Sequence, residues 1–443
     1  MAGSSGNGTG GPLRDLAPLF VDAGIGRGGK GLTLAGVALS EVAGAVGTPV
    51  YVYNAEAVRE RYRALDAAFA AVPHRICYAI KANSNLAVLR VLRDLGAGAD
   101  IVSGGEMRRA LQAGFPAERI VFSGVGKTPA ELEAAVSVGV GHVHLESVEE
   151  MTELGAIAQA KSRKMRVGIR VNPDVTANTH PFISTGQGGI KFGVPFDQVF
   201  DLALAIHRHP WLELDTIAMH LGSQLLDPGP YREGVEKLLG LVTRMREGGI
   251  DTIRSMDIGG GLGIRYQDES PLDPRRVADL VAPLVQASGL TIVLEPGRFL
   301  VGSAGVLLTQ VLSRKHSGGK DLVIVDAGMN DLVRPSHYGA YHAITEVVER
   351  GRAPIRMDVV GPVCETGDFL ALDRELPGLE RGDLLAVLGA GAYGFVMSST
   401  YNTRPRPAEV LVDGGRWAVV RPRIREDEIF EQETVEPQWE AQP

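Results

Sequence analysis

The chain has 443 residues, a net charge of −8 and an apolar fraction of 44%. This length exceeds what one hydrophobic core usually serves, so two domains are expected. The negative charge, without a long basic run, argues against a nucleic-acid or anionic-membrane partner, and no apolar run approaches the roughly 20 residues that span a bilayer. With only two cysteines, Cys77 and Cys364, a cytoplasmic, reducing compartment is expected.

The glycine-rich start, residues 1–11, is expected to be a flexible tail. From about Tyr51, short apolar runs alternate with amphipathic helical patterns, which is typical of parallel βα units. Eight such runs within 51–305 predict a TIM barrel. In chain order they are RICYAI, GADIVS, RIVFSG, HVHLES, MRVGIRVN, DTIAMHLGS, SMDIGGG and TIVLEPGR.

Beyond residue 305 the pattern changes to strands with hardly a strong helix between them, which predicts a mostly antiparallel β domain over 306–443. The segment 12–50 is too short to be a domain and is expected to add an element to that β domain. The predicted strands are LLTQVLS, DLVIVDAG, IRMDVVGP, LLAVLGA and AEVLVDGGRWAVV.

Active sites of TIM barrels lie at the C-terminal ends of the strands, so polar residues there are the first candidates. Lys81 ends the first strand, where partial desolvation should lower its pKa and make its amine a nucleophile. For one lysine taken alone, a solvated surface position is the commoner interpretation. The other polar residues at these ends are Ser103, Ser123, Glu146, Asn172, His220, Gly259 to Gly261, Glu295 and Arg298.

Two glycine-rich stretches, DIGGGLG and EPGR, follow the seventh and eighth strands, where TIM barrels commonly bind phosphate through backbone N–H groups. A reactive lysine together with a phosphate cradle suggests pyridoxal phosphate held as a Schiff base. Glu295 could then keep the pyridine nitrogen protonated, His220 could lie against the ring and Ser223 could bind the phosphate. Taken alone, the glycine stretches could simply form tight turns, and His220 could simply be a core histidine. No metal site is expected.

Seven motifs together resemble those of the fold-type III (alanine racemase-like) PLP-dependent decarboxylases, and within them the diaminopimelate decarboxylases of lysine biosynthesis. They occur in family order and at family-like spacing across nearly the whole chain. Leucine in HLGSQ, where isoleucine is more familiar, is a conservative departure. The motifs are YAIKANSN, HLGSQ, DIGGGLGI, EPGRFLVGSAG, DAGMNDLVRPSHYGAYH, GPVCETGD and GAYGFVMSSTYN.

The resemblance implies a homodimer whose active sites lie between the barrel of one subunit and the β domain of the other. Lys81 would carry the cofactor, His220 would stack on its ring and Glu295 would pair with its nitrogen. Cys364 of the partner subunit would be the acid that protonates the decarboxylated carbon, whereas Cys77 is expected to be a core residue. The other implied cofactor contacts are Ser223, Gly260, Gly261, Gly297, Arg298 and Tyr393.

The resemblance also implies the substrate, meso-diaminopimelate, decarboxylated at its D-centre to L-lysine. Arginine forks suit a carboxylate and Glu365 suits an ammonium, so a substrate tail that carries a carboxylate is favoured over a plain alkylammonium tail. The implied substrate contacts are Arg298, Arg334, Tyr338, Glu365 and Tyr393.

Three alternatives stay open. A sister decarboxylase could act on carboxynorspermidine, a D-amino acid or a carrier-bound glutamyl group. An alanine racemase would share the barrel and the lysine, but resemblance to that family would mean a basic residue at the position of Glu295. A catalytically silent PLP carrier typically loses its lysine, cysteine or phosphate loop, and all three are present here.

Overall fold

The structure is a computed structural model that describes residues 16–175 and 191–439. The predicted tail at 1–11 and most of the insert between Asn172 and Gly193 lie outside these ranges. The chain divides into two compact units. One consists of Asn54–Gly305 and Gly391–Val396, and the other of Met1–Tyr53, Val306–Ala390 and Met397–Pro443.

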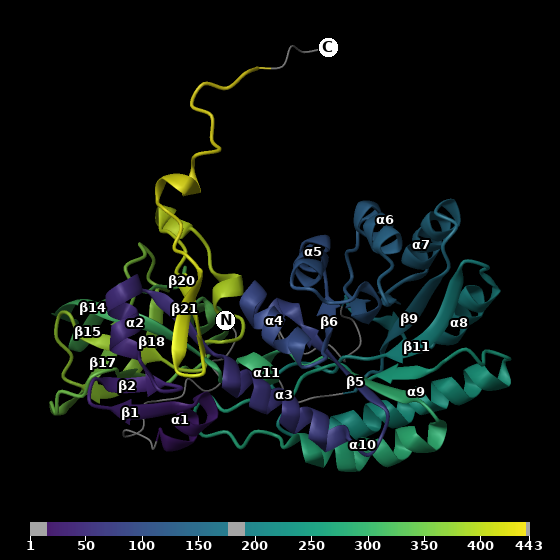
Figure 1. The fold of residues 1–443 in the computed structure, drawn as a ribbon, viewed down its shortest axis with the longest axis horizontal. Coiled ribbons are helices and arrows are strands. Elements are labelled where there is room, and N and C mark those ends of the chain that lie inside the picture. The colour runs from purple at the N-terminus through teal and green to yellow at the C-terminus, as the bar shows by residue number, and fades with distance from the viewer. Residues whose placement is uncertain (1–15, 176–190, 440–443) are drawn as a thin grey trace. The chain divides into compact units, whose positions relative to one another are not determined.

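Eight parallel strands close into a barrel in the first unit (Figure 1). They follow one another around the barrel in chain order, and β13 closes the ring by pairing with β5. All eight apolar runs named from the sequence form these strands, so the TIM-barrel prediction is confirmed. The strands are β5 (His74–Ala79), β6 (Gly98–Ile101), β7 (Ile120–Phe122), β8 (His142–Leu145), β9 (Met165–Asn172), β11 (Leu212–Ala218), β12 (Ser255–Asp257) and β13 (Thr291–Leu294).

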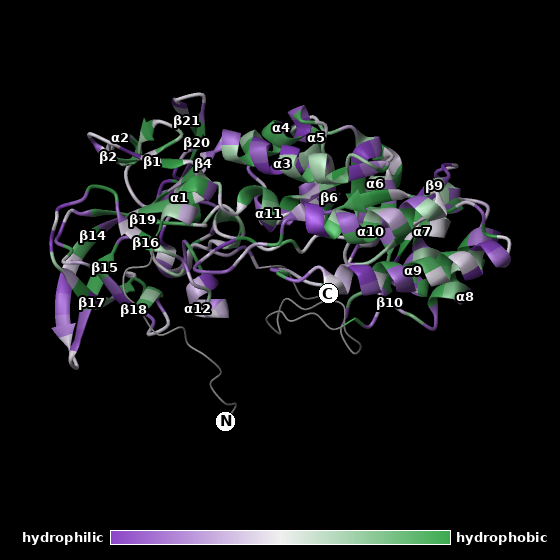
Figure 2. Cartoon of the chain, turned by 90° about the horizontal axis from the view of Figure 1, so that it is seen from below, coloured by the Kyte–Doolittle hydropathy of each residue, from purple (hydrophilic) through white to green (hydrophobic). Residues whose placement is uncertain are grey.

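Amphipathic helices cover the barrel, with α5, α6 and α7 on one side of the strands and α9 and α10 on the other in Figure 1. These helices carry both apolar and polar residues (Figure 2), as expected where one face packs on a sheet. Side-chain caps fix their starts, for example the capping box between Thr128 and Glu131. The helices are α3 (Ala55–Phe69), α4 (Leu86–Asp94), α5 (Gly104–Gln112), α6 (Pro129–Val138), α7 (Val148–Ala160), α8 (Val199–Arg208), α9 (Gly229–Glu247), α10 (Pro274–Ser288) and α11 (Arg298–Val301).

The second unit is built on a mostly antiparallel sheet, as predicted, in the order β18-β17-β15-β14-β4-β20-β21. Within this sheet, β15 and β17 pair in parallel. Strands β16 and β19 pair with each other, and β19 also pairs with β14. The strands are β4 (Val50–Asn54), β14 (Gly305–Ser317), β15 (Lys320–Val325), β16 (Ile344–Glu346), β17 (Pro354–Val360), β18 (Phe369–Pro377), β19 (Leu384–Val387), β20 (Ala408–Asp413) and β21 (Arg416–Arg421).

The segment before the barrel contributes to the second unit, because β4 lies between β14 and β20. Before β4, α1 (Ala17–Ala23) is followed by a small sheet of β1 (Ile25–Gly28), β2 (Gly31–Leu34) and β3 (Val37–Ala38), and then by α2 (Leu39–Val46). Buried apolar residues of these elements share one core with β4, β14 and β20. Strands β16 and β18 were not among the predicted runs.

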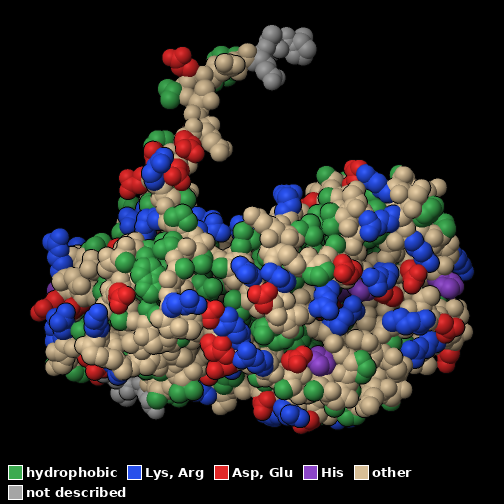
Figure 3. Space-filling view, in the orientation of Figure 1, with side chains coloured by type: hydrophobic (Ala, Val, Ile, Leu, Met, Phe, Trp, Pro, Cys, Tyr) green, Lys and Arg blue, Asp and Glu red, His purple; other side chains and the backbone are tan. Residues whose placement is uncertain are grey.

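The face of the molecule in Figure 3 carries lysine and arginine side chains interspersed with aspartate and glutamate. This mixture agrees with the modest net charge of −8. Among residues 16–175 and 191–439, no helix combines the length and the apolarity needed to cross a bilayer.

Candidate active site

Lys81 lies directly after β5, in the short 3-10 helix Ile80–Ala82. Its Nζ is 2.8 Å from Oδ2 of Asp100, a residue of β6 that is fully buried. The Lys81 side chain is 37% exposed, so its amine can be reached from outside the barrel. Asp100 was not singled out from the sequence. An acidic residue within the apolar run GADIV is the signal that could have revealed it.

The structure contradicts the expectation that the pKa of Lys81 is lowered. Burial lowers this pKa, but the carboxylates of Asp100 and Glu295 outweigh burial and raise it above its ordinary value. The sequence argument counted only desolvation, because it did not place a carboxylate beside the amine. In this structure the amine of Lys81 is therefore held as an ammonium by its partner.

Glu295 follows β13 and is 8% exposed. Its Oε1 accepts a hydrogen bond of 3.4 Å from the Ser123 hydroxyl and lies 3.9 Å from Nδ1 of His144. Burial raises the pKa of Glu295 well above its ordinary value, and Asp100 and Asp257 add to this effect. Burial lowers the pKa of His144 well below its ordinary value, so this ring is neutral. Ser123, named from the sequence, is therefore a direct neighbour of Glu295.

The glycines after β12 form a turn that larger residues cannot replace. A Cβ at Gly260 would lie 2.2 Å from the Glu295 carbonyl oxygen, and Gly261 has a φ of +105°. The N–H of Glu295 donates to the carbonyl oxygen of Gly259 over 2.9 Å. The turn is therefore packed against the backbone at the end of β13, where phosphate binding was predicted.

His220 is attached to the same turn, because its Nδ1 accepts a hydrogen bond of 3.2 Å from the Gly260 N–H. Burial, with Arg170 and Lys81 adding to it, lowers the pKa of His220 well below its ordinary value. The ring is thus neutral, with its proton on Nε2. A neutral ring beside the glycine turn suits the predicted position against a cofactor.

Arg298 begins α11 and is 6% exposed. Its Nη2 donates to Oγ of Ser223 over 2.9 Å, and its Nη1 donates to the Tyr266 hydroxyl over 2.7 Å. Its guanidinium also lies 4.9 Å from the ring centroid of Tyr393. Arg298 therefore joins Ser223 and Tyr393, two further residues named from the sequence.

Tyr393 lies near Lys81, whose pKa it helps to raise. Its N–H donates to the carbonyl oxygen of Ala82 over 2.8 Å, and its φ is +56°. A positive φ is uncommon for a tyrosine and is tolerated where the surrounding structure imposes it. This backbone conformation directs Tyr393 toward the end of the barrel that carries Lys81.

Three of the other strand-end residues have local structural contacts. Ser103 caps α5 by accepting the Glu106 N–H, and Glu146 pairs with Arg170 over 2.9 Å. Asn172 accepts the N–H of Asp174. A helix cap, a buried ion pair and a local backbone hydrogen bond therefore account for these three residues.

In the second unit, the loop that carries Cys364 is fixed by Asp368, which accepts N–H bonds of 2.6 Å from both Val363 and Met329. Cys364 itself is exposed, and so is Glu365. A free cysteine is usually a small, buried, apolar core residue, and exposed Cys364 is not one.

Arg334 and Tyr338, the other two predicted residues of this unit, are the first and last residues of α12 (Arg334–Tyr338). Arg334 is 6% exposed, and its Nη1 donates to Nε2 of His342 over 2.9 Å. Tyr338 is half-buried, and its ring meets that of His337 edge-on.

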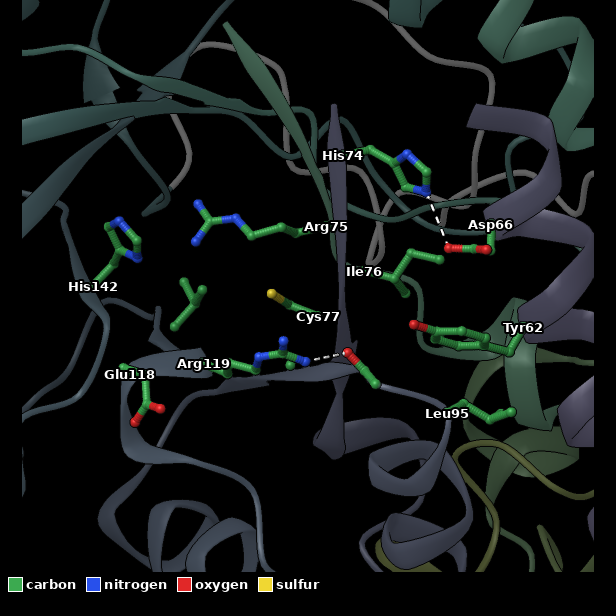
Figure 4. Close-up of a pocket in the computed structure, with 13 residues that line it drawn as sticks. Tyr62, Asp66, His74, Arg75, Ile76, Cys77, Leu95, Glu118, Arg119 and His142 are labelled. Atoms are coloured by element: carbon green, nitrogen blue, oxygen red, sulfur yellow. Dashed lines mark hydrogen bonds and ion pairs between the residues drawn. The ribbon is translucent and has the colours of Figure 1, made fainter. Parts of the chain in front are cut away.

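A pocket of about 350 Å³ lies at the opposite end of the barrel, where the strands begin (Figure 4). Cys77 lines it together with Arg75, Arg119 and His142. Burial raises the pKa of the Cys77 thiol, which leaves it protonated and unreactive. The expectation that Cys77 is a core residue is confirmed, because it is buried against Val121 and Val293.

Comparisons with known proteins agree with this geometry. A family model described as "Pyridoxal-dependent decarboxylase, pyridoxal binding domain" matches residues 55–302. The chain is 49% identical over 405 residues to the diaminopimelate decarboxylase of Aquifex aeolicus, covering 90% of this chain and 95% of the relative. It is 50% identical over 403 residues to that of Pseudomonas aeruginosa, covering 91% and 97%.

A solved structure of diaminopimelate decarboxylase from Helicobacter pylori complexed with L-lysine is also similar. Its TM-score is 0.86 and its identity 40%, covering 89% of this chain and 98% of that one. The barrel, the lysine at its rim and the matching pyridoxal-binding region define a pyridoxal-dependent decarboxylase. With relatives of this identity and coverage, the chain belongs to the diaminopimelate decarboxylase family.

The cofactor of this class is pyridoxal phosphate, and the residues present fit it. Lys81 offers a reachable amine, and the turn at Gly260 leaves no room for a side chain. Glu295 offers a buried carboxyl. These three features supply an attachment point, a backbone cradle and a partner for a ring nitrogen.

Proposed function

We propose that the chain removes CO₂ from the D-centre of meso-diaminopimelate and releases L-lysine. The observation that carries the proposal is the position of Lys81 at the barrel rim, 2.8 Å from buried Asp100, in a chain 49% identical to a diaminopimelate decarboxylase over nearly its whole length. Bound pyridoxal phosphate supplies an electron sink for the charge that remains when CO₂ leaves.

The cofactor is proposed to be held by residues of the barrel unit. Lys81 attaches it through Nζ, and Glu295 faces the ring nitrogen. His220 lies against the ring as a neutral imidazole. The phosphate is proposed to bind to Ser223, Gly260, Gly261, Gly297, Arg298 and Tyr393.

The far end of the substrate carries a carboxylate and an ammonium, which need partners of opposite charge. Arg334 is a fork suited to the carboxylate, and exposed Glu365 is suited to the ammonium. Arg298, Tyr338 and Tyr393 are proposed to complete this grip. The guanidinium of Arg298 also donates to Ser223 and Tyr266. Since Ser223 is a proposed phosphate contact, Arg298 would position the substrate relative to the cofactor.

The test of this function is L-lysine formation by the purified, cofactor-loaded chain. Meso-diaminopimelate should yield L-lysine, whereas the LL isomer should yield none, since it has no D-centre. Carboxynorspermidine, run in parallel, tests the sister decarboxylase alternative. A chain that binds the cofactor but produces no L-lysine from the meso isomer would contradict the proposal.

We expect Cys364→Ala to reduce turnover by roughly 10²- to 10⁴-fold, the usual contribution of a general acid, while cofactor binding stays unchanged. The exposed thiol is proposed to protonate the carbon that has lost CO₂. Turnover and cofactor absorbance, measured on the same samples, separate the two effects. Cys77→Ala is the matched control, because that thiol is buried and protonated. Turnover unchanged in Cys364→Ala would assign the proton to another donor.

We expect Asp100→Asn to shift the pH dependence of cofactor capture toward lower pH. Asp100 raises the pKa of Lys81, so removing its charge lowers that pKa and increases the fraction of free amine at neutral pH. The measurement is the initial rate of cofactor capture as a function of pH, followed by absorbance. Asp94→Asn, a change on α4, is the control. A profile that does not move would mean that Asp100 does not set the pKa of Lys81.

A homodimer that works in the cytoplasm is proposed as the functional form. Exposed Cys364 and Glu365 lie on a loop whose backbone is hydrogen-bonded to Asp368, as expected for residues that act on a neighbouring subunit. Two free cysteines suit a reducing compartment. Mixing Lys81→Ala with Cys364→Ala subunits should restore part of the activity if sites are shared between subunits, whereas sites within one subunit would stay inactive.

A further inference from the structure

A second carboxyl lies beside that of Glu295. It belongs to Asp257, the last residue of β12, which is fully buried. One carboxyl oxygen of Asp257, one of Glu295 and one ring nitrogen of His144 all lie within 4.8 Å of one another. Asp257 is the first residue of the DIGGGLG stretch, but the proposed chemistry gives its carboxyl no role.

The two oxygens of Asp257 have different partners. Oδ1 accepts the Gly259 N–H over 2.7 Å, at the start of the glycine turn. No N–H or hydroxyl of residues 16–175 and 191–439 donates to Oδ2. The carboxyl of Glu295 lies close by, with one oxygen of each group within 4.8 Å of the other. Two neighbouring carboxyl groups can share a hydrogen bond when one of them carries a proton.

The charges around Asp257 and Glu295 favour a state in which the two carboxyl groups together hold one proton. Lys81 is engaged with Asp100, and Arg75 donates to Ser255. His144 is neutral. Burial raises the pKa of both Asp257 and Glu295, and Asp100 adds to the effect on each. Two ionised carboxylates would repel each other in a buried site, so the pair retains a single proton at neutral pH.

We propose that Asp257 is a positioning residue that keeps this shared proton, so that Glu295 faces the pyridine nitrogen as a carboxylate. The inference rests on the proposed cofactor site. A protonated ring nitrogen beside Glu295 stabilises the ionised form of Glu295, and the proton then resides on Oδ2 of Asp257, which donates it to Glu295. Only a proton changes its place between two oxygens, and no other bond is made or broken.

Two substitutions of similar size distinguish this role from simple packing. In Asp257→Asn, Oδ1 can still accept from Gly259 and Nδ2 can donate to Glu295, as a protonated aspartate does. Leucine, unlike the protonated Asp257 of the cofactor-loaded chain, donates no hydrogen bond to Glu295, so the buried carboxyl of Glu295 takes up a proton itself, and the ring nitrogen loses its anionic partner.

The readout is the ¹⁵N chemical shift of cofactor labelled at the pyridine nitrogen, together with turnover. We expect the Asn variant to keep the protonated-nitrogen signal and turnover within roughly threefold of wild type, since its hydrogen bonds are conserved. We expect the Leu variant to show a deprotonated nitrogen and to lose roughly 10- to 100-fold in turnover. A Leu variant with a protonated nitrogen, or an Asn variant without one, would overturn the role of Asp257.

If the Leu variant does not fold, wild-type protein decides the question. Infrared spectra of the chain labelled with ¹³C at aspartate carboxyls should gain the band of a protonated carboxyl on cofactor loading, and Asp257→Asn should lack this gain. A spectrum without the gain overturns the inference. A wild-type chain that loads no cofactor through Lys81 would instead refute the proposed function itself, and this inference with it.

Discussion

Lys81→Ala should abolish L-lysine formation from meso-diaminopimelate, with a loss on the order of 10⁴-fold or more, as for other essential nucleophiles. The reason is chemical, because alanine offers no amine to attach the cofactor. The absorbance of the attached cofactor should disappear with the activity. Borohydride reduction followed by peptide mapping should mark Lys81 in the wild type and no residue in the variant.

Lys164→Ala is the control for the loss of a lysine. Lys164 precedes β9 at the opposite end of the barrel, is 54% exposed and pairs with Glu213 over 3.0 Å. An exposed pair of this kind contributes little to stability. Full activity is expected. If Lys81→Ala still formed L-lysine at the wild-type rate, the attachment of the cofactor would have to be sought elsewhere.

Glu295→Gln should reduce turnover by roughly 10²-fold or more, through loss of the carboxylate that faces the ring nitrogen. Glutamine keeps the shape of the side chain, so cofactor loading through Lys81 should persist, which separates the electronic effect from a folding effect. The measurement is turnover at saturating substrate, with the ¹⁵N shift of the labelled ring nitrogen moving to its deprotonated value.

Glu133→Gln provides the matched control, because Glu133 is an exposed surface carboxylate paired with Lys161 over 2.6 Å. Its turnover and its ring-nitrogen shift should both equal those of the wild type. A Glu295→Gln protein that keeps the protonated-nitrogen shift would show that another group maintains the ring charge.

The sequence predicted those features that depend on residues close together along the chain. Eight apolar runs with helical patterns between them predicted the barrel, because a buried parallel strand must be apolar along its length. Lys81, Glu295 and the glycines after β12 could be named as candidates because the ends of barrel strands meet on one face.

The sequence was less informative about interactions between side chains on different strands. Asp100 and Asp257 each look like a single polar residue inside an apolar run, and nothing local indicates that they lie against Lys81 and Glu295. The wrong sign for the pKa of Lys81 has the same origin, since desolvation can be anticipated from an apolar strand but a carboxylate from the next strand cannot. The bonds from Arg298 to Ser223 and Tyr266 were also unforeseen.

The amino-acid sequence by itself determined the barrel, the second β domain and most of the polar residues around the site, because periodicity and strand-end position are properties of neighbours along the chain. The tertiary structure alone decided which charges meet. It set Asp100 against Lys81 and Asp257 against Glu295, and the balance between burial and these partners sets the protonation of each group.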